Sequence, residues 1–426
     1  MNFGASKEIS DITQQSEPVS LCSVNEILSR KGPISIIELV QTCIEEAYAL
    51  RASDIHIEPA EDTVQMRLRI DGVLHDKCNF PKTILSEVIS RIKVLANLRT
   101  DEHQAAQDGR FRIVAKNGTP VDIRISITPT YYGENAVLRL LADHSSQFTL
   151  EKLGFNENDR KRIENAIMQP YGMILATGPT GSGKTTTLYT LIKMLNSKEV
   201  SIITIEDPIE YAVPGITQIQ INPRSNLTFA SGLRSILRQD PNIIMVGEVR
   251  DAETAGIAVN TALTGHLLLS TLHTNDSATT LPRLLDMDID AYLVSSTVNV
   301  AIGQRLVRKV CESCKKKHTL TSAEQHNLEL SLPERLKKNT DFALHTFYKG
   351  TGCEACENTG YSGRIGIYEV LVVSPRIREA ILNRESSTVI KNIAIAEGMT
   401  TMFEDGLIKA SHGKTTLSEV LRTINE

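Results

Sequence analysis

The stretch from Gly178 to Thr185 has the full pattern of a phosphate-binding loop: a glycine, four residues of any kind, and Gly-Lys-Thr. It reads Gly178, Pro179, Thr180, Gly181, Ser182, Gly183, Lys184 and Thr185. A buried-strand run ends at Thr177, and a helical pattern follows from Thr186. Because the glycines let consecutive backbone N–H groups point at one phosphate chain, this setting predicts nucleotide binding. Lys184 is expected to reach the β- and γ-phosphates, and Thr185 to ligate Mg²⁺ with ATP.

The whole-chain properties narrow the class of protein. The chain has 426 residues, a net charge of −5, 4% aromatic residues and no tryptophan, which argues against nucleic acid as a partner. The longest apolar runs are too short to span a bilayer, so no transmembrane segment is expected. The polar N-terminus lacks the features of a secretory signal, which predicts a cytoplasmic location. Seven cysteines in a cytoplasmic chain indicate metal ligands or free thiols.

Changes in hydrophobic period divide the chain into an α+β part with alternating strands and an α/β part in which buried strands alternate with helices. Cysteine pairs and a helical segment follow. The predicted parts are a mostly disordered segment 1–35, an α+β domain 36–142, a linker 143–150, a P-loop α/β domain 151–305, a cysteine-bearing subdomain 306–366 and a helical subdomain 367–426.

Two carboxylates follow predicted strands of the α/β domain. Glu206 comes directly after the strand 201–205, and Glu248 follows the strand 242–246 after Gly247. Ligands of such sheets bind at the carboxyl ends of the strands, so either group is placed to hold Mg²⁺ or orient water. A solvated loop carboxylate is the alternative for each. His266 and His273 bracket the next strand; both are candidates for the site, and buried core histidines are the alternative.

Four arginines are candidates for phosphate contacts. Arg234 and Arg238 are four apart on a predicted helix and share a face, which suits a phosphate, a neighbouring subunit or simply solvent. Arg110 and Arg124 belong to the first domain, and Arg124 lies on the polar face of its strand.

Two C-x-x-C pairs predict a metal site. Cys311 and Cys314 form the first pair, and Cys353 and Cys356 the second. Four thiolates suit structural Zn²⁺. The run Lys315 to His318 beside the first pair is interpreted as a solvated charge run, with a nucleic-acid patch as the alternative.

At these residues the chain resembles the secretion and pilus-assembly ATPases, the GspE/PilB-like family of type II secretion and type IV pilus systems. Thr204 to Glu210 is similar to the family's acidic box, Leu237 to Asp251 to its second Walker motif, and Gly265 to Thr274 to its histidine box. Ala52 to Pro59 and Gln107 to Arg110 are similar to its N-terminal PAS-like domain. The four cysteines match the zinc subdomain of assembly ATPases.

The resemblance implies a hexameric motor on the cytoplasmic face of the bacterial inner membrane, working with an inner-membrane platform protein. It implies a PAS-like domain followed by a RecA-like domain, with Arg110 and Arg124 as γ-phosphate contacts, Arg234 and Arg238 as sensors, and Glu206 and Glu248 as the magnesium and water carboxylates. Larger members carry a further N-terminal domain, which about 35 residues here do not provide. Secretion, pilus extension and DNA uptake remain open, and a nucleic-acid motor or a regulatory nucleotide-binding subunit are the alternatives.

Overall fold

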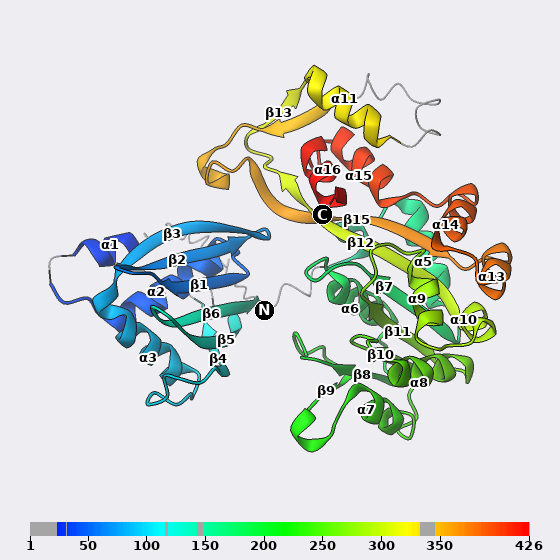
Figure 1. Cartoon of the computed structure of the whole chain (residues 1–426), viewed down its shortest axis with the longest axis horizontal. Helices are drawn as coiled ribbons and strands as arrows, with labels where there is room; N and C mark the ends of the chain where they lie inside the picture. The colour runs from blue at the N-terminus through cyan, green and yellow to red at the C-terminus, as the bar shows by residue number, and fades with distance from the viewer. Residues whose placement is uncertain (1–23, 31, 116–117, 143–147, 333–345, 426) are drawn as a thin grey trace, which may run out of the picture. The chain divides into compact units, whose positions relative to one another are not determined.

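The computed structural model describes residues 24–30, 32–115, 118–142, 148–332 and 346–425. Contacts divide the chain into two compact units, Met1–Ala142 and Asp143–Glu426 (Figure 1). Residues 1–23 of the predicted disordered segment and residues 143–147 of the predicted linker lie outside the described residues. Among the described helices, none combines the length and the apolar character needed to cross a bilayer.

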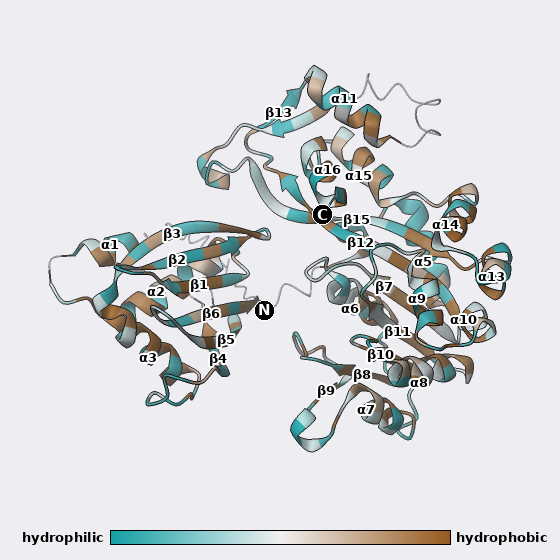
Figure 2. Cartoon of the chain, viewed as in Figure 1, coloured by the Kyte–Doolittle hydropathy of each residue, from teal (hydrophilic) through white to brown (hydrophobic). Residues whose placement is uncertain are grey.

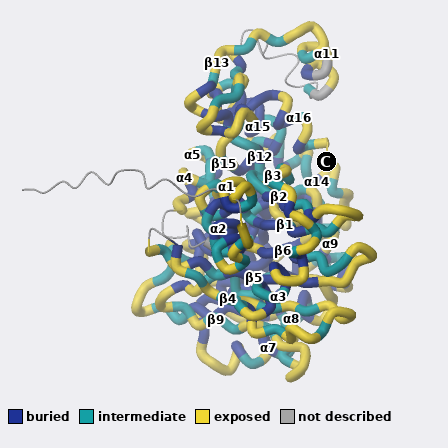
Figure 3. Tube along the Cα trace, turned by 90° about the vertical axis from the view of Figure 1, so that its left-hand side faces the viewer, coloured by how far each residue is buried: buried dark blue, intermediate teal, exposed yellow. Residues whose placement is uncertain are grey.

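Unit 1 is an antiparallel sheet of order β3-β2-β1-β6-β5-β4 with helices packed on its apolar face. Its described elements are α1 (Val24–Ser29), α2 (Ile36–Ala49), β1 (Asp54–Pro59), β2 (Thr63–Ile70), β3 (Val73–Pro81), the 3₁₀ turn η1 (Lys82–Ile84), α3 (Leu85–Leu95), β4 (Gln107–Val114), β5 (Pro120–Thr130) and β6 (Gly133–Ala142). Every second residue of β5 from Val121 to Ile127 is buried, so the predicted alternation is confirmed. Figure 3 colours the described part of the chain by burial. The PAS-like assignment of this unit stays a prediction.

Unit 2 is built on a sheet of order β15-β12-β7-β11-β10-β8-β9, in which only the β12–β15 pair is antiparallel. Its described strands are β7 (Gly172–Thr177), β8 (Ile202–Glu206), β9 (Thr217–Gln220), β10 (Ile243–Val246), β11 (Leu267–Leu272), β12 (Val298–Val310) and β15 (Tyr361–Val372), with a separate hairpin of β13 (Lys315–His318) and β14 (Phe347–Gly350). The parallel core confirms the predicted α/β class.

Helices pack on both faces of this sheet. The described helices of unit 2 are α4 (Leu150–Leu153), α5 (Glu157–Ile167), α6 (Lys184–Leu195), α7 (Phe229–Ile236), α8 (Ala252–Leu263), α9 (Thr280–Asp286), α10 (Ala291–Thr297), α11 (Ser322–Ser331), α13 (Pro375–Leu382), α14 (Ser387–Ala396), α15 (Met402–Ser411) and α16 (Leu417–Asn425), with 3₁₀ turns η3 (Pro223–Ser225) and η5 (Glu354–Cys356). Of these, α11 packs beside the hairpin of β13 and β14.

Strand β7 lies inside this sheet and shows why the sequence builds two layers. Met173 and Leu175 point into the core made with α7, α8 and the C-terminal helices, whereas Ile174 and Ala176 point into the core made with α5 and α6. A strand buried on both faces has no polar face, which explains its unbroken apolar run. The apolar colouring of β7, β10 and β11 contrasts with the hydrophilic β13 in Figure 2.

Two predicted boundaries fall inside strands. The boundary at 305/306 lies within β12, and the one at 366/367 lies within β15. These strands pair from Val300↔Val372 to Val310↔Tyr361 and carry the main sheet continuously into the cysteine-bearing segment. The segment is therefore the far end of a long antiparallel arm. The predicted subdomains 306–366 and 367–426 are parts of unit 2 by their contacts.

A buried charge cluster joins α5 to α15. Asp159 is fully buried, accepts a hydrogen bond from Asn156 Nδ2 at 2.6 Å, and pairs with Arg162 at 3.4 Å. Burial raises the pKa of Asp159 to about 6; Asn156 and Arg162 oppose that shift, and Asp405 adds to it. Lys409, which pairs with Asp405 at 2.5 Å, completes the cluster.

The raised pKa of Asp159 predicts a pH-dependent stability. The folded state favours the protonated carboxyl, so this contribution is present near pH 4 and is lost as the pH rises through 6. The unfolding free energy of the wild type, relative to Asp159→Asn, should fall by about 3 kcal/mol over that rise. Urea unfolding of both proteins at several pH values measures it. A difference that stays constant with pH would contradict the assignment.

Candidate active site

The phosphate-binding loop links the carboxyl end of β7 to the start of α6. Gly178, Gly181 and Gly183 have φ values of 145°, 79° and 89°, which side-chain-bearing residues rarely adopt. At Gly178 a Cβ atom would also lie 2.4 Å from the carbonyl oxygen of Gln304. Helix α6 begins without a side-chain cap, so its first N–H groups remain available to an anion.

Two side chains of the loop are placed for phosphate. Lys184 is nearly buried and donates to the carbonyl oxygens of Gly178 at 2.8 Å and Pro179 at 3.0 Å. Burial lowers the pKa of Lys184, while the negative charge of Glu248 opposes that shift. The hydroxyl of Ser182 is buried with no hydrogen-bond partner among the described residues. An orphaned hydroxyl is costly, and a phosphate oxygen is the acceptor that fits it here.

Glu248 lies on the same edge of the sheet as the loop. The hydrogen bonds Gly247 N–Ile205 O at 2.8 Å and Val249 N–Thr271 O at 3.0 Å hold its backbone between β8 and β11. Its carboxylate pairs with Arg250 at 2.6 Å and with His273 Nε2 at 3.2 Å. The structure therefore brings Glu248 and His273 together at the carboxyl end of the sheet.

Glu206 ends β8 on this edge but is sequestered. It is 2% exposed, and its carboxylate accepts hydrogen bonds from Thr204 at 2.5 Å, Gln218 at 3.2 Å and the Tyr189 hydroxyl. Burial raises the pKa of Glu206, and these donors oppose the shift. Of the two predicted carboxylates, Glu248 is the one whose negative charge acts on Lys184.

His266 is separated from this cluster. It precedes β11, whereas His273 follows it, and β11 pairs in parallel with β7 from Leu267↔Gly172 to Leu272↔Thr177. Six strand residues span about 20 Å, so His266 lies at the opposite edge of the sheet. Its Nδ1 lies 3.2 Å from the carbonyl oxygen of Thr261.

The two arginines of the α7 region are held locally. Arg234 pairs with Glu253 of α8 at 2.7 Å. Arg238 lies beyond the end of α7, since Leu237 is the C-cap, and it donates to Arg234 O at 2.9 Å. Their predicted role as sensors stays a prediction.

The arginines of unit 1 face one another. Arg110 of β4 pairs in register with Arg124 of β5, and Arg124 pairs with Arg139 of β6. Adjacent like charges on neighbouring strands are unfavourable unless an anion or acid lies nearby. Contact of Arg110 and Arg124 with a γ-phosphate stays a prediction.

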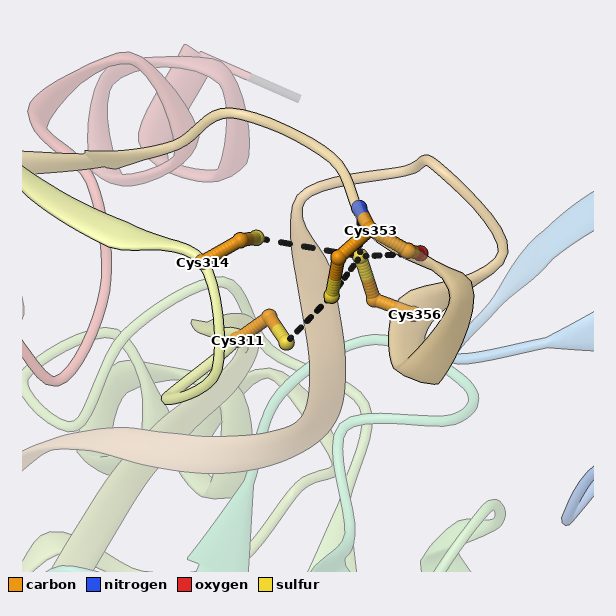
Figure 4. A group of neighbouring side chains, drawn as sticks. All are labelled: Cys311, Cys314, Cys353 and Cys356. Carbon is orange, nitrogen blue, oxygen red and sulfur yellow. Dashed lines mark hydrogen bonds between the residues drawn. The ribbon is translucent and has the colours of Figure 1, made fainter.

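The four predicted metal-ligating cysteines meet at the far end of the arm (Figure 4). Their sulfur atoms all lie within 4.8 Å of one another. The Sγ–Sγ distances are 3.8 Å for Cys311–Cys353, 3.8 Å for Cys314–Cys356 and 3.6 Å for Cys353–Cys356. A regular tetrahedron of Zn–S bonds of about 2.3 Å has sulfur edges of about 3.8 Å. The donor set therefore fits a tetrahedral zinc ion.

The backbone around Cys356 supports a thiolate. The N–H groups of Cys353 and Gly360 each donate to its sulfur at 3.3 Å. Burial raises the pKa of this thiol, but the backbone donors, together with the side chains of Cys353 and Cys314, lower it to about 6 overall. Zinc binds thiolates, so these donors favour the metal-binding form.

Two residues near the loop were not predicted from the sequence. Arg250 pairs with Glu248 and follows it by two positions, so its place in the sequence could have indicated a contact with Glu248. Gln304 of β12 contacts the loop through its side-chain amide. Its only sequence signal is a glutamine after the apolar run Val300 to Ile302, and its partners are remote in the chain.

The sequence matches a known protein family. The model of the Type II/IV secretion system protein family matches residues 29–422. The chain belongs to this family. Membership confirms the resemblance inferred from the motifs.

Two relatives and one solved structure are also similar to this chain. The chain is 47% identical over 388 residues to the type IV pilus assembly ATPase PilB of Thermus thermophilus, covering 91% of this chain and 43% of that one. It is 46% identical over 399 residues to the type II secretion system protein E of Xanthomonas campestris pv. campestris, covering 94% and 69%. The chain thus spans less than half of the first relative. The solved pilus retraction motor PilT with bound ADP aligns with a TM-score of 0.60 and 25% identity, covering 89% and 95%.

Proposed function

We propose that the chain is an ATPase that hydrolyses ATP to power assembly of pili or pseudopili in a type IV pilus or type II secretion system. The observation that carries the proposal is the placement of Lys184, the orphaned Ser182 hydroxyl and Glu248 on one sheet edge. Family membership supplies the process, since relatives are named as pilus-assembly ATPases and secretion proteins. A measurement of inorganic phosphate released from Mg-ATP by the purified chain tests the proposed ATPase activity. A chain that binds ATP but releases no phosphate would refute that activity.

The residues divide the chemistry between them. The amides of the loop and of the first turn of α6 bind and orient the phosphates. Lys184 places positive charge beside the β- and γ-phosphates, and Thr185, on the first turn of α6, would hold Mg²⁺ through its hydroxyl. When bound, Mg²⁺ neutralises charge that develops on the phosphate oxygens. Glu248 orients the attacking water, and His273, which contacts it, limits where its carboxylate can point.

The proposal also includes the oligomeric state of the chain, its location, its partner and its metal. By family analogy the chain works as a homo-hexamer at the cytoplasmic face of the bacterial membrane, with an inner-membrane platform protein as partner. Zinc at Cys311, Cys314, Cys353 and Cys356 completes the proposal, supported by sulfur spacings that match a tetrahedral site.

Replacing Glu248 with glutamine separates binding from chemistry. The amide keeps the shape but loses the charge, so turnover should fall about a hundredfold while ATP still binds. Phosphate release and equilibrium binding of a fluorescent ATP analogue measure the two effects. Glu199→Gln, an exposed acid beyond α6, is the matched control and should retain wild-type rates. Equal turnover by both variants would remove Glu248 from the mechanism.

A further inference from the structure

Gln304 lies beside the phosphate-binding loop because of strand register. Strand β12 pairs in parallel with β7, with Gly303 opposite Thr177, the last residue before the loop. The next residue on β12 is therefore level with the start of the loop. Gln304 is 1% exposed, an unusual burial for a polar amide.

Both ends of the Gln304 amide are used. Its Nε2 donates to the carbonyl oxygen of Ser182 at 2.8 Å, and its Oε1 accepts from the Thr187 hydroxyl at 2.9 Å. Thr187 also closes the first turn of α6, since its backbone N–H donates to Gly183 O at 3.1 Å. The amide therefore bridges the last part of the loop and the first turn of the helix.

The Ser182 contact fixes the direction of a backbone donor. In a planar trans peptide the carbonyl oxygen and the following N–H point in opposite directions. When Gln304 holds the Ser182 carbonyl on the β12 side, the N–H of Gly183 is turned away from β12. Gly183 has a φ of 89°, and the peptide before it is one that could otherwise rotate.

We propose that Gln304 is a positioning residue that orients the Gly183 amide, and through Thr187 the first turn of α6, for the phosphates of the nucleotide. The inference rests on the proposed function, because it requires that phosphates bind at this loop. In this proposal Gln304 acts through its hydrogen bonds to Ser182 and Thr187, and not by touching the nucleotide. The amide is suited to this because it donates and accepts at once, and no charged side chain does both.

Titration of Mg-ADP into the 426-residue chain by calorimetry tests the proposal. Gln304→Leu removes both hydrogen bonds at similar volume and should weaken ADP binding about tenfold or more. Asn299→Ala is the matched control, because Asn299 also bridges β12 to the β7 side, donating to Tyr171 O at 3.0 Å, but at the end remote from the loop. It should stay within about twofold of the wild type.

Gln304→Glu provides a readout that lost packing does not produce. An ionised carboxylate accepts from Thr187 but repels the Ser182 carbonyl, whereas the protonated acid donates to it. Neither partner titrates, so the ratio of variant to wild-type dissociation constants should be largest at pH 8 and should shrink at pH 6. This variant keeps the proposal testable if Gln304→Leu does not fold, as judged by its melting curve.

The outcomes distinguish a failure of the proposed function from a failure of the proposed role of Gln304. If Lys184→Ala binds ADP like the wild type, the proposed function fails. If Lys184→Ala loses ADP but folded Gln304→Leu does not, only the role of Gln304 fails. A dissociation-constant ratio for Gln304→Glu that is independent of pH, or an equal loss in Asn299→Ala, also overturns it.

Discussion

Replacing Lys184 with alanine should give a folded chain whose phosphate release falls at least about a thousandfold. The Lys184 ammonium is nearly buried and is held by the carbonyl oxygens of Gly178 and Pro179. Phosphate oxygens can replace those partners. The attraction between the ammonium and the phosphates is then strong, because the buried site has a low dielectric constant. Alanine leaves the loop amides in place but removes that charge. Steady-state phosphate release from Mg-ATP is the measurement.

Lys193→Ala is the matched control for this prediction. Lys193 lies in the last turn of the same helix, about 14 Å along its axis from Lys184, where it stacks over the Tyr211 ring at 5.1 Å. The control should hydrolyse ATP at close to the wild-type rate. A Lys184→Ala protein with unchanged turnover would show that the loop does not bind the reacting phosphates.

The parts of the site that the sequence predicted are the local ones. The loop from Gly178 to Thr185 and its flanking strand and helix depend on neighbours in the chain, so the pattern suffices to place them. Glu248 and His273 follow strands that end at the same edge, and a parallel sheet brings such ends together. Because His266 and His273 bracket β11, the same reasoning separates His266 from this site.

The parts that the sequence did not predict depend on contacts between remote segments. Glu206 is placed correctly at a strand end, but its burial follows from Tyr189 and Gln218, which reach it from a helix and an edge strand. Gln304 is a second case, because strand order decides which residue lies beside the loop. Hydrophobic period identifies strands but carries no information on their order in the sheet.

The long arm of β12 and β15 is a third feature that the sequence did not predict. The change of residue type near 306 predicted a boundary there, yet the strands continue through it to the cysteines. The hairpin of β13 and β14 packs through Phe347 on α11, α15 and α16. The turns that carry the cysteines instead form a separate cluster, which consists of the cysteines themselves. These turns therefore depend on whatever links the four sulfur atoms.

Removing zinc should unfold the turns that carry the cysteines at the far end of this arm, while the P-loop core persists. Metal analysis should find about one zinc per chain, and structural zinc contributes on the order of 10 kcal/mol in small peptides. The amides of Cys311 and Thr351, which donate to Gly360 O at 3.0 Å and Cys314 O at 3.2 Å, should then lose protection from hydrogen exchange. Amides of β7 and β11, which are buried on both faces, should keep theirs.

Cys356→Ser provides the matched genetic test. It removes the ligand whose thiolate the backbone supports, so zinc content should fall well below one per chain and exchange should rise at the same amides. Cys78→Ser changes a half-buried cysteine of unit 1, outside the cluster, and should retain full zinc. A native wild-type chain that contains no zinc, and whose four clustered cysteines all react freely with a thiol reagent, would exclude the site.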